Sequence, residues 1–121
     1  MEYWFLITSA ILSLVGMLFH GVVGQKVYMG NINKSEMAPM TKSLSLVSWH
    51  IFTIFLFISA ATLFYVAFNP GLVVAIYPVI GINLLGSILF ISLSIGKHRG
   101  LLRLPGAYSM GGTALFGWLG I

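Results

Sequence analysis

Two long stretches of the chain contain no charged residue, one from Tyr3 to Gln25 and one from Ser43 to Gly96. A helix that crosses the hydrocarbon core of a bilayer needs about 20 predominantly apolar residues. The composition agrees with membrane insertion, because 59% of the residues are hydrophobic and 7% are charged, whereas soluble domains carry roughly a quarter charged residues. This composition excludes a soluble enzyme, a nucleic-acid-binding protein and a disordered tail.

Polar segments and turn signals divide the apolar sequence into four predicted membrane spans. The first loop is the polar stretch from Met29 to Thr41, the second is Asn69-Pro70-Gly71, and the third begins at Gly96. The predicted helices cover residues 3–28, 42–68, 72–95 and 104–121. The last one, at about 17 residues or about 25 Å, is short for a bilayer. We expect an all-α membrane protein, one transmembrane domain over residues 1–121 with four helices in an antiparallel up-and-down bundle.

The basic residues are confined to one side of this predicted bundle. All of them lie in or beside the first and third loops: Lys26, Lys34, Lys42, Lys97, Arg99 and Arg103. The positive-inside rule places those loops in the cytoplasm and both termini outside. The sequence therefore predicts a multi-pass protein of a prokaryotic inner membrane. We also expect no removable signal peptide, because the N-terminus has no basic segment.

The third loop is predicted to contact lipid headgroups. Basic residues close to a membrane surface attract anionic lipids with about 1 kcal/mol each. Lys97, Arg99 and Arg103 are the residues for which we predict this contact.

Two histidines lie at membrane depth, His20 in the first span and His50 in the second. Ionisable residues inside a membrane mark functional sites by default. His20 lies six residues before Lys26 and His50 lies eight residues after Lys42, so the helical rise puts them roughly 9 Å and 12 Å from the same boundary. Antiparallel neighbouring helices would bring the two rings to nearly the same depth.

Three interpretations of this histidine pair stay open. Each ring can hydrogen-bond across helices and hold the bundle together, as polar side chains in membranes commonly do. The pair can instead provide the axial ligands of a b-type haem, although directly adjacent helices 8–10 Å apart leave little room for one. The third interpretation is a metal or proton site, in which Met17 joins His20 and His50 to hold copper.

Asn83, near the middle of the third span, adds a polar group to the membrane interior, and Ser87 follows it on the same helix face. Together with the two histidines, they predict a line of polar residues that runs through the helices toward the basic loops; we call this line the polar thread. A small-solute transporter or channel would rest on that thread. No charged residue is available in the membrane to bind or couple an ion.

Short motifs give the chain a partial resemblance to known proteins. His20-Gly21-Val22-Val23-Gly24-Gln25-Lys26 fits H-x-x-x-G-[EQ]-[KR], Trp49-His50 starts the second span, and Gly96-Lys97-His98 precedes the last one. In these motifs the chain resembles a group of small uncharacterised four-helix bacterial inner-membrane proteins. The resemblance implies the four-helix membrane fold and carries no activity with it.

The leading functional prediction is a non-catalytic accessory or assembly subunit of a larger membrane complex. The chain has no cysteine and only two acidic residues, and it lacks any catalytic triad, carboxylate pair or phosphate-binding loop. Besides the lipid bilayer, its predicted partners are other membrane subunits or a second copy of itself. The alternative is an electron-transfer protein that binds haem b or copper.

Overall fold

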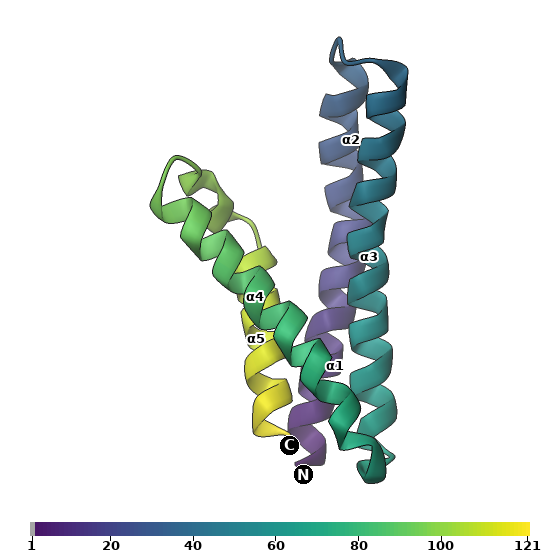
Figure 1. The fold of residues 1–121 in the computed structure, drawn as a ribbon, viewed down its shortest axis with the longest axis vertical. Helices are drawn as coiled ribbons and strands as arrows, with labels where there is room; N and C mark the ends of the chain where they lie inside the picture. The colour runs from purple at the N-terminus through teal and green to yellow at the C-terminus, as the bar shows by residue number, and fades with distance from the viewer. Residues whose placement is uncertain (1) are drawn as a thin grey trace.

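The computed structural model describes residues 2–121, and every regular element within them is helical (Figure 1). The first helical stretch consists of α1 (Tyr3–Leu18), the π-helical turn η1 (Phe19–Gly24) and α2 (Gln25–Lys34), which follow one another without a break. The next elements are α3 (Pro39–Ala67), the 3-10 turn η2 (Pro70–Ala75) and α4 (Ile76–Ile95). The 3-10 turn η3 (Arg99–Arg103) then leads into α5 (Gly106–Leu119). The all-helical fold class is thus confirmed.

Three helical stretches within residues 2–121 are long and apolar enough to cross a membrane. They are Tyr3–Lys34, Pro39–Ala67 and Pro70–Ile95, with 32, 29 and 26 residues. α5 has only 14 residues, or about 21 Å at the helical rise, which is less than the roughly 30 Å of a hydrocarbon core. Residues 2–121 therefore form four antiparallel helical stretches, of which three are long enough to span.

The last helix is shorter than its predicted range of 104–121 because of Pro105. The residue before a proline is pushed out of the helical region by the proline ring. Leu104 accordingly has extended backbone angles (φ −89°, ψ 153°), and α5 begins at Gly106.

The first loop is also shorter than predicted. The helix does not end near Tyr28 but continues to Lys34, and α3 begins at Pro39. Polar side chains such as Asn31 do not end a helix by themselves, whereas proline favours the first helical position. At 32 residues, or about 48 Å, the first helical stretch is longer than the roughly 30 Å thickness of a hydrocarbon core.

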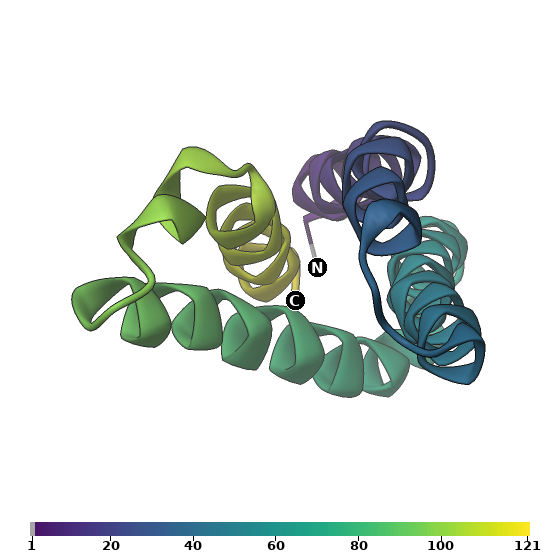
Figure 2. The same cartoon turned by 90° about the horizontal axis from the view of Figure 1, so that it is seen from above.

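The helices form two hairpins that meet at the end where the termini lie. α1 packs against both α3 and α5, and α5 in turn packs against α4 (Figures 1 and 2). The backbone N–H of Glu2 donates a hydrogen bond of 2.8 Å to the carbonyl of Gly120. The apolar core lies at this end and is built from Leu6, Ala10, Leu63, Val66, Ala67, Ile76, Val79, Ile80 and Ala114.

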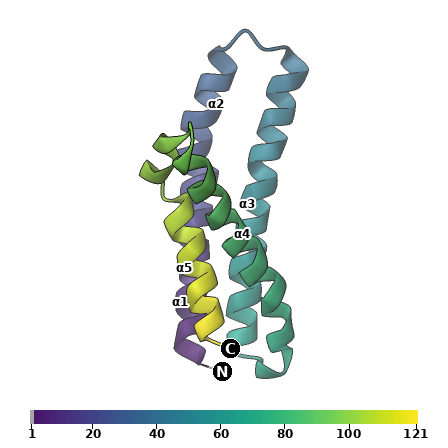
Figure 3. The same ribbon diagram turned by 60° about the vertical axis from the view of Figure 1, so that its left-hand side comes forward.

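Toward the opposite end the two hairpins diverge, which gives the molecule a V shape (Figure 1). In Figure 3 the α4–α5 hairpin lies in front of the first helical stretch and ends short of the α2–α3 connection. The burial pattern of α3 follows this shape. Its buried residues all lie from Leu56 onward, and no residue from Pro39 to Phe55 is buried. The up-and-down order of the helices is as predicted, but they do not form a closed bundle.

Candidate functional site

The site begins with the π-helical turn η1, which contains His20. π turns are rare and occur mostly as single turns within α-helices, frequently at functional sites. Here the backbone N–H of Gln25 reaches back five residues to the carbonyl of His20. The same carbonyl accepts a second hydrogen bond from outside the helix, because the indole Nε1 of Trp49 donates to it at 2.9 Å.

His20 and Trp49 bind each other reciprocally across the α1–α3 hairpin. The Nε2 atom of His20 lies 3.0 Å from the backbone carbonyl oxygen of Trp49, so Nε2 carries the donated proton. The two rings are also stacked, with centroids 4.0 Å apart and planes inclined by 11°. Two hydrogen bonds and one stacking contact therefore join the same pair of residues.

Further aromatic rings extend this pair on both sides. Tyr28 of α2 stacks on Trp49 with centroids 4.4 Å apart, and Phe52 places its edge against His20 at 4.9 Å. We call His20, Tyr28, Trp49 and Phe52 the aromatic clasp. Gly24 makes room for it, since a Cβ atom at this position would lie 2.8 Å from Cζ2 of Trp49.

His50 lies outside the clasp, although it directly follows Trp49. Its Nδ1 lies 3.3 Å from the hydroxyl of Thr53 on the same helix. Consecutive residues of an α-helix point about 100° apart, so when Trp49 faces His20, His50 points to the side. The structure thus places both histidines on neighbouring helices without a hydrogen bond between them.

These contacts bear on the predicted cofactor sites. An axial haem ligand or a copper ligand needs one ring nitrogen with a free lone pair. Nε2 of His20 donates to a carbonyl and the ring lies against Trp49 and Phe52, so Nδ1 is the nitrogen that keeps a lone pair. Met17 is half-buried one turn before His20. Within residues 2–121 no three His, Cys, Asp or Glu side chains gather where they could hold a metal ion.

Asn83 is buried at the point where the two hairpins begin to diverge. Its Nδ2 donates to the carbonyl of Val79 at 2.9 Å and to the hydroxyl of Ser59 on α3 at 3.3 Å. Its Oδ1 has no hydrogen-bond donor among the described residues. Ser87 does not continue this contact, because its hydroxyl donates to the carbonyl of Ala107 on α5. Asn83 and Ser87 thus serve two different helix contacts rather than one continuous thread.

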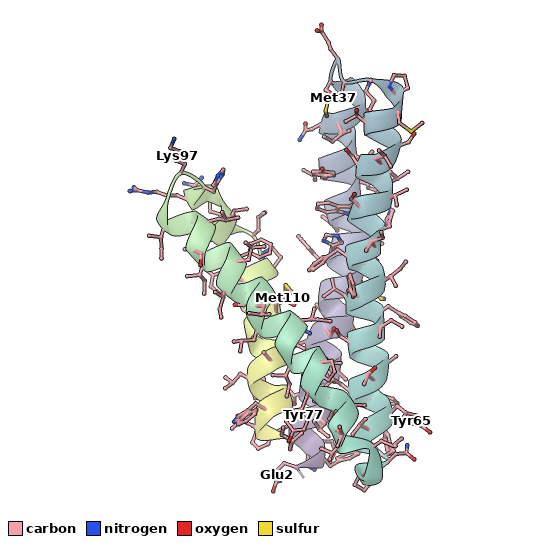
Figure 4. The ribbon with its side chains drawn as sticks, viewed as in Figure 1. Glu2, Met37, Tyr65, Tyr77, Lys97 and Met110 are labelled. Atoms are coloured by element: carbon pink, nitrogen blue, oxygen red, sulfur yellow. The ribbon has the colours of Figure 1, made fainter. Side chains whose placement is uncertain are left out.

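The two connections that carry basic residues both lie opposite the termini, as the loop positions predict, but at the ends of two separate hairpins (Figure 1). Lys97 and Met37 mark these two ends in Figure 4, and Glu2 marks the end with the termini. Lys97, Arg99 and Arg103 are all exposed.

Sequence reasoning missed the role of Trp49, which appeared only as part of a motif. The signal for it was the glycine four residues after His20. A glycine beside a membrane histidine, facing a helix that carries tryptophan at similar depth, indicates a large ring packed against the backbone.

Comparison with known proteins adds no identification. The chain matches no family model, no curated protein and no solved structure.

Proposed function

We propose that the chain is a non-catalytic accessory subunit that packs beside a larger protein in a prokaryotic inner membrane, with both termini outside. The proposal rests on the divergence of the two hairpins, which within residues 2–121 leaves part of α3 without a neighbour on one side. None of the α3 residues from Pro39 to Phe55 is buried, and α4 diverges from α3 along this half (Figure 1). A membrane helix with one neighbour retains faces on which a second helix can pack.

One face of α3 is favoured for this contact. Ser59 meets Asn83 of α4, and Phe55, Ser48 and Ser45 lie within an arc of about 80° on the same side of the helix, four, eleven and fourteen residues before it. Phe52 also lies on this side but packs against His20. We call Phe55, Ser48 and Ser45 the open face of α3. They continue the α4-facing side after α4 has diverged. Two serines make this face suitable for a partner helix, because small residues allow close approach and hydroxyls can donate across helices.

The aromatic clasp supports a structural rather than a redox role for the histidines. Nε2 of His20 and Nε1 of Trp49 each donate a hydrogen bond to the other residue's backbone carbonyl, so both bonds lie within the hairpin. The stacking of Trp49 and the edge contact of Phe52 pack the His20 ring within the hairpin. The clasp holds the first helical stretch and α3 together in the part of the hairpin from which α4 has diverged. A pair of helices that is held rigid in this way is suited to packing against a partner protein.

The test is photocrosslinking in native membranes. A photoreactive phenylalanine analogue replaces Phe55 on the open face or Phe57, which is 53% exposed and lies about 160° away around the helix. We expect a discrete protein adduct from position 55 and only lipid adducts from position 57. Lipid adducts alone from both positions would contradict the proposal.

A further inference from the structure

The connection between α4 and α5 lies along the side of α4 rather than beyond its end. Gly106, where α5 begins, packs against the ring of Phe90. Phe90 lies five residues before the end of α4 at Ile95, so α5 begins about 8 Å below that end. The chain must descend this distance through η3. The hydroxyl of Tyr108 holds it there by donating to the carbonyl of Leu102 at 2.9 Å.

Because η3 descends beside α4, the two elements enclose a small apolar depression. It has a volume of about 120 Å³ and is lined by Leu89, Phe90, Leu93 and Leu101. Leu89 and Leu93 are more than a third exposed, at 57% and 41%. The depression is therefore open to the surrounding bilayer.

Basic residues lie on both sides of Leu101 in the sequence. Arg99 and Arg103 bracket Leu101 within η3, and Lys97 precedes them at the end of α4; all three are exposed. No acidic residue follows Glu36 in the sequence, so nothing in this half of the chain offsets the positive charge. Exposed basic residues on the same short turn as a residue that lines an apolar depression are complementary to a molecule with an anionic head and a hydrocarbon tail.

We propose that this place binds one anionic phospholipid, with its phosphate on Arg99 and Arg103 and part of one acyl chain against Leu89, Leu93 and Leu101. We name this place the η3 lipid site. A phospholipid matches both the basic residues and the apolar depression. A free phosphate would contact the basic residues alone and leave the depression empty. The α2–α3 connection provides the comparison, because it is flanked by Lys34 and Lys42 and belongs to the other hairpin (Figure 1).

Native mass spectrometry of the full chain in detergent tests the charged half. Phosphatidylglycerol is the anionic probe and phosphatidylcholine the zwitterionic one. Arg99→Gln/Arg103→Gln should weaken phosphatidylglycerol binding about 10- to 30-fold. The matched control Lys34→Gln/Lys42→Gln removes the same charge from the other connection and should change binding less than threefold. Equal loss in both double variants would overturn the site, because it would show attraction by net charge alone.

A second pair of variants tests the apolar half without changing charge. Leu89→Trp fills the depression and should weaken phosphatidylglycerol binding at least fivefold. Leu85→Trp, one turn earlier and 67% exposed, lies outside the depression and should leave binding unchanged. A large excess of inorganic phosphate should not displace the lipid. Full displacement by phosphate, or equal behaviour of the two tryptophan variants, would overturn the proposal.

Discussion

At the scale of single residues, polar side chains on α1 join the helices by donating to backbone carbonyls of their neighbours. Ser9 donates to Thr113 at 2.6 Å, Ser13 donates to Leu56 at 2.9 Å, and His20 donates to Trp49. Such acceptors exist at every turn of a helix, since a carbonyl has two lone pairs and uses one within the helix. Three bonds on one side of α1 therefore fix its position against both α3 and α5.

Gly24 is the residue at which this packing is most sensitive to substitution. Gly24→Ala places a Cβ atom 2.8 Å from the ring of Trp49, and overpacking of this kind costs about 1–3 kcal/mol. We expect a lower thermal unfolding midpoint in detergent, together with a change in tryptophan fluorescence.

The control for this substitution lies in α2. A Cβ atom at Gly30 would have nothing within 4 Å, so Gly30→Ala should keep or raise the midpoint, because alanine is favoured over glycine in helices. If both variants unfold at the same temperature, the clasp is not packed as described.

The sequence predicts part of this site. The stripe of Ser9, Ser13, Gly16, His20 and Gly24 could be predicted to face other helices because its spacing follows one helix face. The partners could not be predicted, because backbone carbonyls leave no sequence signature. The pairing of His20 with Trp49 rather than His50 depends on the rotation of α3, which the sequence pattern does not fix.

At the scale of elements, α5 is a packing element of the fold. Its glycines face side chains of the same chain: a Cβ atom at Gly106 would meet Phe90, one at Gly111 would meet Ser87, and one at Gly112 would meet Leu12. The absence of side chains lets the short helix approach α1 and α4 closely, as small residues commonly do in membranes. These glycine faces are thus occupied within the chain and are not free for a partner.

Two nearby glycines, Gly100 and Gly106, are expected to differ in their sensitivity to substitution. Gly106→Ala would bring a Cβ atom to 2.6 Å from the Phe90 ring, whereas a Cβ atom at Gly100 has open space around it. We expect Gly106→Ala to destabilise the isolated protein by about 1–3 kcal/mol and Gly100→Ala to change stability by less than about 0.5 kcal/mol. Chemical denaturation in mixed micelles measures both. Equal stabilities would mean that α5 does not pack against α4 as described.

Element boundaries were predicted well where apolar residues meet a turn and less well where polar residues continue a helix. The ends of α3 and α4 near Asn69 and Gly96 agree with the sequence. The extension of α2 to Lys34 was missed, because hydropathy reports where a membrane ends and not where a helix ends. The start of α5 could have been found from Pro105 and its effect on Leu104.

At the scale of the whole molecule, the defining feature is the divergence of two hairpins from a shared core. The core residues lie near the termini, and Asn83 and Ser59 form a polar contact near the point of divergence. Helix number, antiparallel order and the grouping of basic loops followed from the sequence. The V shape did not, because the angle between α4 and α3 depends on how side chains of several helices fit together.

The most direct test measures the divergence itself by double electron–electron resonance in liposomes. The chain has no cysteine, so spin labels can be placed on introduced cysteines without removing native ones. One pair replaces Leu44 and Ile95 at the basic end, and a second pair replaces Tyr65 and Tyr77 near the core; all four side chains are exposed. The account predicts a clearly longer separation for Leu44–Ile95 than for Tyr65–Tyr77. Equal separations at both ends would show a closed bundle and contradict the open face of α3 on which the proposed function depends.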